Sequence, residues 1–320
     1  MKSIDCFNGD ADGICALTQL RLANPRESEL ITGVKRDINL LARVDANAGD
    51  EVTVLDVSLD KNRQGLERIL SAGANVFYCD HHFSGDIPEH ENLEAVINTT
   101  SDVCTSLLVN QKLKGAFLEW AIVGTFGDNL KKSAHGLAKP LSLASTDLAR
   151  LEELGIYLNY NGYGATIDDL YFAPADLYKL TVQHESALGF INDDADSFNV
   201  LKNGYNNDMR NAAAIDAVYA TDRVAVFEFP NEPWARRVSG VYSNDLANSF
   251  ADRAHAVITQ KADSGYLVSV RAPLNNKQGA DEVCRQFETG GGRTAAAGIN
   301  HLPASDLPKL IEALNAHYTA

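Results

Sequence analysis

The chain has 320 residues, of which 45% are hydrophobic, and its formal net charge at pH 7 is −15. This length predicts two domains, each with its own apolar core. No window holds the roughly 18 apolar residues of a membrane-spanning helix, and the N-terminus lacks an apolar signal-peptide core, so we expect a cytoplasmic protein without a membrane partner. The acidic charge, with no basic run, argues against a long nucleic-acid partner and favours a small anionic substrate.

Strand-like and helix-like segments alternate through the first 130 residues. Strands are predicted at Ser3–Phe7, Glu51–Asp56, Asn75–Asp80 and Ala95–Asn98, and helices at Gly13–Ala23, Asn62–Ala72, Cys104–Leu113 and Gly115–Phe126. This alternation is typical of an α/β fold with a parallel sheet. In such sheets, ligands bind beyond the carboxyl ends of the strands.

The rest of the chain divides into a helical and a strand-rich part. Residues 131–220 are predicted to be mostly helical and polar, as an extension followed by a connector. Strands are then predicted at Arg223–Phe229, Ala235–Ser239, Ala256–Gln260 and Gly265–Arg271, before a helix at Leu307–His317. We therefore predict a parallel-sheet domain over residues 1–190, a helical linker over 191–221, and a smaller α/β domain over 222–320.

The five cysteines, at positions 6, 15, 79, 104 and 284, are odd in number and show no CxxC spacing. This pattern favours reduced, buried thiols over a disulfide framework or a zinc ribbon.

Carboxylate and imidazole side chains follow the predicted apolar segments in four separate stretches of the first domain. They are Asp10, Asp12, Asp56, Asp80, His81, His82 and Asp128. Such a set can hold two divalent cations, and paired cations hydrolyse phosphate esters. Ligands that are mostly oxygen, with one or two imidazoles, favour Mn²⁺ or Mg²⁺ over zinc.

The first motif, FNGDADG, has three other interpretations. An EF-hand loop would need Glu at its twelfth position, where this chain has Gln19, and a helix before it rather than a strand. A dinucleotide-binding turn would need GxGxxG, which is absent. An ordinary strand-to-helix turn with solvated aspartates remains open for the motif taken alone.

In this order the motifs GDADG, LDVS, CDHH and GDN resemble those of the DHH phosphoesterase superfamily, which is named for the Asp-His-His found here at residues 80–82. The segment GGGRTAAAGIN (290–300) resembles the glycine-rich signature of the DHH-associated C-terminal domain. The resemblance implies an oligoribonuclease-like (nanoRNase-type) enzyme with two Mn²⁺ ions, or Mg²⁺ in their place. Its catalytic domain would span residues 1–190 and its substrate-binding domain residues 222–320, across a cleft.

The resemblance also implies roles for individual residues. The metal ligands would be Asp10, Asp12, Asp56, His81 and Asp128, with Asp56 and Asp128 bridging the ions. The catalytic residues would be His82, beside the scissile phosphate, and Asp80, which would orient the histidines. The substrate-binding residues would be Arg271, Gly290, Gly291, Gly292 and Arg293. Glycines let backbone N–H groups approach a phosphate, and arginine can clamp it with two hydrogen bonds. A simple loop at the glycines and an exposed strand arginine are the alternatives.

The chain departs from the family's pattern at three positions. Cys6 stands where the oligoribonuclease branch often has His, and Asn8 stands where the RecJ nuclease branch has Asp. Asn8 or water would then replace one ligand of the first metal. Arg293 stands where the C-terminal motif usually has His.

The expected function is two-metal hydroxide attack on short oligonucleotides or linear dinucleotides such as pGpG and pApA, which yields mononucleotides. An exopolyphosphatase or pyrophosphatase is the first alternative, and Tyr242 and Tyr266 are the candidates for a base-stacking aromatic that would exclude it. A cyclic-dinucleotide phosphodiesterase, a RecJ-type exonuclease and a nucleotide-binding regulator with a decayed site are the others. The sequence leaves both a monomer and a homodimer open.

Overall fold

A computed structural model describes residues 1–318. The described chain forms two compact units, the first from Met1 to Gly204 and the second beginning at Tyr205. The boundary falls inside one helix, α9 (Ala195–Ala213), within the segment 191–221 for which we expected a linker. The same segment also contains strand β6 (Ala217–Ala220), which pairs with the sheet of the second unit. In the described residues no helix is both long and apolar enough to cross a membrane.

The first unit is built on a five-stranded sheet whose strands all run parallel, in the order β2-β1-β3-β4-β5. The strands are β1 (Ser3–Phe7), β2 (Glu29–Ile31), β3 (Glu51–Leu55), β4 (Asn75–Asp80) and β5 (Leu93–Ile97). The prediction of a parallel sheet is confirmed, although β2 was not predicted. All five carboxyl ends lie along one edge, because the strands are parallel.

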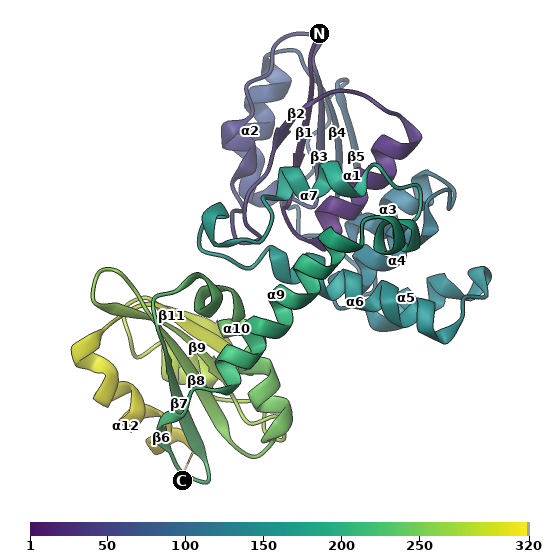
Figure 1. The fold of residues 1–320 in the computed structure, drawn as a ribbon. Helices are drawn as coiled ribbons and strands as arrows, with labels where there is room; N and C mark the ends of the chain where they lie inside the picture. The colour runs from purple at the N-terminus through teal and green to yellow at the C-terminus, as the bar shows by residue number, and fades with distance from the viewer. Residues whose placement is uncertain (319–320) are drawn as a thin grey trace. The chain divides into compact units, whose positions relative to one another are not determined.

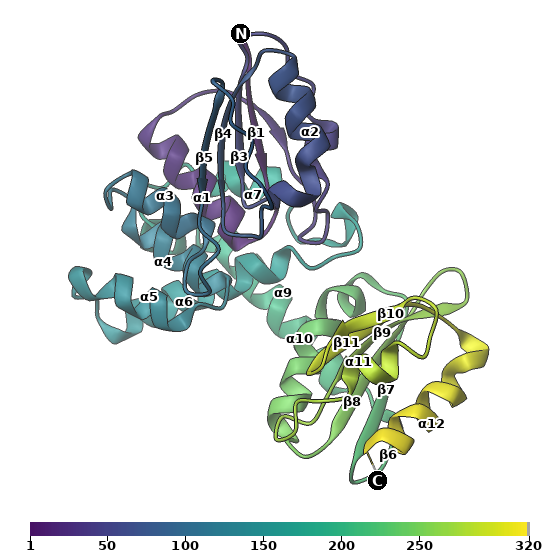
Figure 2. The ribbon, with the colours of Figure 1, turned by 180° about the vertical axis from the view of Figure 1, so that it is seen from behind.

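Helices cover both faces of this sheet, as Figures 1 and 2 show. Helix α2 (Leu59–Ser71) and the short η1 (Leu40–Arg43) pack on one face, where Val54 and Leu66 belong to the same buried core. Helices α1 (Ala11–Ala23), α3 (Thr105–Lys112) and α7 (Pro174–Thr181) lie on the other. There the rings of Phe7 and Tyr178 meet edge to face, with their centroids 5.8 Å apart.

The remainder of the first unit is helical, which confirms the helical character predicted for residues 131–220. Its helices are α4 (Leu118–Gly127), α5 (Lys131–Ala138), α6 (Ser145–Asn161) and α8 (Ala187–Asp193), with short turns η2 (Lys139–Leu141) and η3 (Ile167–Asp169). Two glycines allow close packing here. A Cβ at Gly127 would lie 2.3 Å from the Cβ of Ala11, and a Cβ at Gly155 would lie 2.4 Å from the carbonyl oxygen of Val123. The end of α4 therefore approaches the start of α1.

The second unit contains a six-stranded mixed sheet in the order β10-β11-β9-β8-β7-β6, in which only β7 and β8 are parallel. Its further elements are β7 (Val224–Phe229), α10 (Pro233–Ser249), β8 (Ala254–Gln260), β9 (Gly265–Arg271), α11 (Ala280–Cys284), β10 (Gly290–Arg293), β11 (Ala296–Pro303), η4 (Ala304–Asp306) and α12 (Leu307–Tyr318). The prediction of a second α/β domain is confirmed in fold class.

The predicted strand at Ala235–Ser239 is wrong, because these residues belong to helix α10. Pro233 occupies the first turn of that helix, where its missing N–H costs nothing. Buried side chains then recur at Ala235, Val238, Tyr242 and Leu246, which is the three-to-four-residue spacing of a helix. Five residues were too short a window to reveal this period.

Candidate metal and phosphate site

Three strands of the first sheet carry polar side chains at their carboxyl ends. Asn8 and Asp10 follow β1, Asp56 follows β3, and Asp80, His81 and His82 end or follow β4. The strand order puts β1, β3 and β4 side by side, so these residues meet at one edge of the sheet. This is the edge at which open α/β sheets bind ligands.

Helix α1 begins at this edge because Asp10 caps it. The Oδ1 atom of Asp10 accepts hydrogen bonds from the backbone N–H groups of Asp12, at 3.0 Å, and Gly13, at 3.2 Å. An aspartate in this role satisfies donors that the first helical turn cannot pair internally. The helix consequently starts at Ala11, two residues before its predicted start.

Asp12 is held by the N-terminus of helix α3. Its Oδ2 and Oδ1 atoms accept hydrogen bonds from the backbone N–H groups of Thr105 and Ser106, each at 2.7 Å. The Oγ1 atom of Thr105 donates to Oδ1 of Asp56 at 3.2 Å, so the same turn orients a second carboxylate. Sequence reasoning did not identify Thr105 or Ser106, because a backbone N–H group leaves no signature in a motif.

His81 faces three carboxylates through its Nε2 atom. This nitrogen lies 3.4 Å from Oδ1 of Asp56 and 3.9 Å from Oδ2 of both Asp12 and Asp128. Its Nδ1 atom lies 3.0 Å from the carbonyl oxygen of Val103, which can only accept a hydrogen bond. Nδ1 therefore carries the proton in the neutral ring, and Nε2 is left with the lone pair that a metal ligand needs.

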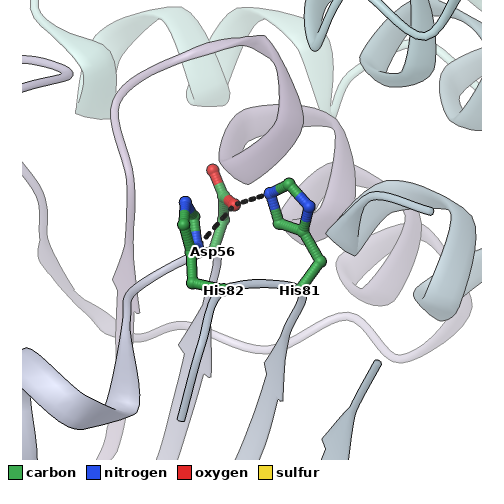
Figure 3. A group of neighbouring side chains, drawn as sticks. All are labelled: Asp56, His81 and His82. Atoms are coloured by element: carbon green, nitrogen blue, oxygen red, sulfur yellow. Dashed lines mark ion pairs between the residues drawn. The ribbon is translucent and has the colours of Figure 1, made fainter. Parts of the chain in front are cut away.

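His82 lies on the other side of Asp56, as Figure 3 shows. Its Nδ1 atom is 3.9 Å from Oδ1 of Asp56 and 2.7 Å from Oδ1 of Asp80. Asp80 is fully buried and contacts His82 rather than His81. Since the side chain of His82 is 45% exposed, it is the histidine of the pair that a substrate can reach.

Burial and crowding shift the pKa values of this cluster. Burial, followed by the negative charges of Asp10 and Asp12, raises the pKa of Asp56 well above the usual carboxyl range. Burial and the charge of Asp12 likewise raise the pKa of Asp128 to about 7. For His81, burial opposes protonation, but the contact with Asp56 and the charge of Asp12 raise its pKa to about 10. Carboxylates held this close favour a cation among them.

The residues fit a divalent metal ion. Two groups each place one potential ligand atom per residue within 4.8 Å of one another, namely Asp12, His81 and Asp128, and Asp56, His81 and His82. Oxygen and imidazole ligands of this kind suit Mn²⁺ or Mg²⁺. Asp10 belongs to neither group among the described residues. Cys6 packs into the apolar core against α2, so its thiol takes no part.

A cavity of about 450 Å³ opens in front of these side chains. Its lining includes Asp10, Asp56, His81, His82 and Asp128, together with residues that sequence reasoning missed: Lys35, Ile38, Lys61 and Phe83. The Nζ atom of Lys35 lies 2.5 Å from Oδ2 of Asp10. Phe83 is 72% exposed, which is unusual for a residue with a large aromatic side chain.

In the second unit, Arg271 and Arg293 lie on the same face of the sheet. Arg293 is opposite Ala296 in the β10–β11 pair, and Ala296 is opposite Arg271 in the β11–β9 pair. Directly opposite residues of antiparallel strands share a face. The Nε atom of Arg271 donates to Oδ1 of Asn244 at 2.6 Å, and its Nη1 atom donates to Oγ of Ser269 at 3.0 Å.

The three glycines before Arg293 differ in whether the backbone there could accept a side chain. A Cβ at Gly290 would lie 1.7 Å from the carbonyl oxygen of Cys284, and Gly292 has a φ of +141°, so both positions need glycine for the fold. A Cβ at Gly291 would meet no other atom within 4 Å. The segment forms strand β10 rather than a loop. Only Gly291 faces open space that a ligand could enter.

The two tyrosines expected as stacking candidates have other contacts. Tyr242 is 7% exposed and packs against Phe227 and Phe229 in the core of the second unit. The hydroxyl of Tyr266 donates to Oε1 of Glu228 at 3.0 Å. Phe83, beside the cavity of the first unit, is the better candidate for contact with a base.

No protein-family model matches the sequence, and no curated protein matches it. Solved structures do match its fold. Exonuclease RecJ bound to manganese is 16% identical with a TM-score of 0.61, over 99% of this chain and 89% of that chain. The pGpG-specific phosphodiesterase PggH from Vibrio cholerae is 13% identical with a TM-score of 0.57, over 99% of both chains.

A third similar structure is a DHH-domain protein described as a member of the s1p family of ribosomal proteins. It is 12% identical with a TM-score of 0.60, over 98% of this chain and 86% of that chain. All three alignments extend through both units of the chain. The chain therefore has the fold of the DHH-domain proteins, with a parallel-sheet N-terminal unit and an α/β C-terminal unit.

Proposed function

We propose that the chain is a metal-dependent phosphodiesterase that hydrolyses short oligonucleotides or linear dinucleotides, such as pGpG and pApA, to mononucleotides. The observation that carries this proposal is the meeting of Asp12, Asp56 and Asp128 around Nε2 of His81 at the carboxyl edge of the sheet. Mn²⁺, or Mg²⁺ in its place, is the expected metal, and similar RecJ structures are described with each of these ions.

Asp12, Asp56, His81 and Asp128 would hold a divalent ion, whose chemistry when bound is to make water more acidic and to neutralise charge on the phosphate. The chain's own side chains and backbone would position the substrate and the metal ligands. His82, exposed and oriented by Asp80, is in a position to touch the scissile phosphate or protonate the leaving oxygen. Thr105 and Ser106 fix the carboxylates of Asp56 and Asp12 through hydrogen bonds, so the ligands need not reorganise during the reaction.

A nucleotide substrate is favoured by the aromatic ring at the cavity. Phe83 follows His82 directly and offers an exposed ring beside the site. Stacking of a base on such a ring is sequence-tolerant, because every base has a π-face. In the second unit, the sheet face that carries Arg271 and Arg293 has the side chains that bind a phosphate group. The named substrate of the similar PggH, pGpG, agrees with the proposed size class.

A second candidate is an exopolyphosphatase or pyrophosphatase, because Lys35 and Lys61 both line the cavity. A phosphoanhydride substrate has no base, so cationic side chains and a metal ion are enough to bind and cleave it. A substrate panel separates the two. With Mn²⁺ present, 5′-phosphorylated dinucleotides are compared with longer RNA and DNA, cyclic dinucleotides, polyphosphate and 3′-phosphoadenosine 5′-phosphate. We expect the highest kcat/KM for dinucleotides, pGpG among them. Faster turnover of polyphosphate would replace the proposal with the second candidate.

A further inference from the structure

Lys35 brings a positive charge into the acidic cluster. Its Nζ atom lies 2.5 Å from Oδ2 of Asp10 and 2.7 Å from Oδ1 of Asn159, and 5.7 Å from the ring centre of Tyr163. The Asp10 side chain is only 4% exposed and that of Lys35 is 29% exposed. The Coulomb attraction between two charges shielded in this way from water is larger than at the surface, while removal of one partner would leave the other charge buried and unpaired.

The backbone holds Lys35 in this position. Its N–H group donates to the carbonyl oxygen of Gly162 at 2.9 Å, and its carbonyl oxygen accepts from Nδ2 of Asn8 at 3.4 Å. The loop also approaches β1 closely, since a Cβ at Gly9 would lie 1.9 Å from the carbonyl oxygen of Gly33. These contacts fix the loop against the acidic cluster. The position of Lys35 beside Asp10 is therefore set by the fold of the loop.

Asp10 has little left to offer a metal ion. Its Oδ1 atom accepts two backbone hydrogen bonds at the start of α1, and its Oδ2 atom contacts the ammonium group. Its neighbour Asn8 contributes a neutral amide, whose buried Oδ1 atom has no hydrogen-bond partner in the described residues. Asp10 is therefore already paired with a cation, and its remaining carboxylate neighbour is Asp56.

The side of the cluster next to His81 is more acidic, although the charge of Lys35 also acts there, on Asp56 and Asp128. Asp12, Asp56 and Asp128 surround Nε2 of His81, and no lysine or arginine forms an ion pair with any of the three in the described residues. This side has three carboxylates and an imidazole for one divalent ion.

We propose that the ammonium group of Lys35 takes the place of one of the two cations of the centre, so that the protein binds one divalent ion tightly, among Asp12, Asp56, His81 and Asp128. This inference rests on the proposed metal-dependent function and refines its metal content. A second ion would have to displace Lys35 from Asp10 or bind beside an ammonium group, which repels it.

Metal stoichiometry tests the inference directly. Purified protein is stripped with a chelator and titrated with Mn²⁺ by calorimetry, and bound Mn²⁺ is counted by elemental analysis and by electron paramagnetic resonance. For the wild type we expect one tight site and the six-line signal of an isolated ion, with any second ion at least about 100-fold weaker. Lys35→Met, which keeps the alkyl chain but not the charge, is expected to bind two ions tightly and to give the signal of a coupled pair.

Matched variants make the outcome decisive. Lys35→Gln is a second neutral variant and should behave like Lys35→Met, whereas Lys35→Arg keeps the charge and should bind one ion. Lys61→Met removes a lysine that lines the same cavity but pairs with Asp60 instead, so it should also bind one ion. Circular dichroism confirms that each variant is folded.

The outcomes separate this inference from the proposed function. Two tight ions in the wild type, or one ion in both neutral variants, would overturn the role of Lys35 while leaving a metal-dependent hydrolase intact. One ion in the wild type and two in Lys35→Met would support the inference even if no phosphodiester were cleaved. Failure of every variant to bind Mn²⁺ would overturn both.

Discussion

The Nε2 atom of His81 lies 3.4 Å from Oδ1 of Asp56, although the two residues follow different strands. The backbone of Asp56 is in the left-handed region, with a φ of 57°. Its N–H group donates to the carbonyl oxygen of Cys79, which continues the hydrogen-bond ladder between β3 and β4 by one residue. A non-glycine residue in this conformation is strained, and such strain is concentrated at functional sites.

The first prediction concerns the carboxylates around His81. Asp128→Asn keeps the shape of the side chain but removes the charge that a divalent ion requires. We expect a fall in Mn²⁺-dependent kcat of more than about 100-fold, with an unchanged circular dichroism spectrum. Asp56→Asn should act in the same way. Asp102→Asn is the control, because Asp102 is an exposed aspartate outside the cavity. Activity of Asp128→Asn within about tenfold of the wild type would contradict the ligand role.

The second prediction concerns the exposed ring of Phe83. Phe83→Ala should lower kcat/KM for pGpG by about tenfold or more through a higher KM, because a stacked base contributes on the order of 1–3 kcal/mol. Turnover of pyrophosphate, which has no base, should be unchanged. Ile87→Ala serves as the control, since Ile87 is also exposed but does not line the cavity. Equal losses for both substrates would assign Phe83 a structural role.

The third prediction concerns the sheet face of the second unit on which Arg271 and Arg293 lie. Arg293→Ala removes an exposed guanidinium group. It should raise KM for a short phosphorylated dinucleotide far more than for a generic chromogenic diester, which lacks the second phosphate. Steady-state kinetics on the two substrates measure this difference. The same rise for both would remove the proposed phosphate contact.

Neighbouring glycines provide a matched pair for the same surface. In Gly291→Ala the new methyl group would enter open space, so the melting temperature should hold while KM rises as it does in Arg293→Ala. In Gly290→Ala the methyl group would meet the carbonyl oxygen of Cys284, so that variant should lose stability. An unchanged KM in Gly291→Ala would mean that no phosphate approaches this strand.

Much of this architecture was predictable from the sequence, because the chemistry follows apolar strands. The Asp and His residues after β1, β3 and β4 could be placed on one edge of a sheet as soon as the strands were predicted to be parallel. The fold class and the resemblance to DHH proteins followed from the same motifs, and both agree with the fold that the structure comparison found.

Lys35 could not be predicted for a specific physical reason. It follows β2, a strand of three residues at the edge of the sheet, which is too short to show a pattern. Because β2 is parallel to β1, the loop after it reaches the same edge as Asp10. Because β2 was not predicted, Lys35 could not be placed at the site. Phe83 was not predicted for another reason. A single phenylalanine in a sequence is most often a core residue, and only the structure shows that this one is exposed.

The fourth prediction follows from the raised pKa values of Asp56 and Asp128. In metal-free protein both carboxyls release their protons at higher pH than they do in the unfolded chain. Their contribution to stability therefore falls as the pH rises, for Asp128 as the pH rises through its pKa of about 7. Bound Mn²⁺ replaces those protons. The rise in melting temperature on adding Mn²⁺ should therefore be larger at pH 8 than at pH 5.5. In Asp128→Asn this pH dependence should be weaker.

The fifth prediction concerns His255, which is fully buried on β8 in the second unit. Burial, and then the charge of Arg253, lower its pKa to about 4. The unfolded chain takes up this proton near pH 6.5, so the stability of the second unit is retained above that pH and lost as the pH falls toward 4. We expect unfolding to cost about 2 kcal/mol less at pH 4.5 than at pH 7 from this residue alone.

Trp234 makes that loss measurable, because it lies in α10 of the second unit. Urea unfolding is followed by its fluorescence in a Trp120→Phe background, which removes the only other tryptophan. His255→Gln cannot take up the proton in either state, so its stability should depend less on pH over this range. His301→Gln, at a partly exposed histidine, should retain the wild-type pH dependence. If His255→Gln and the wild type lost equal stability between pH 7 and pH 4.5, the acid sensitivity of this unit would have to come from its carboxyl groups.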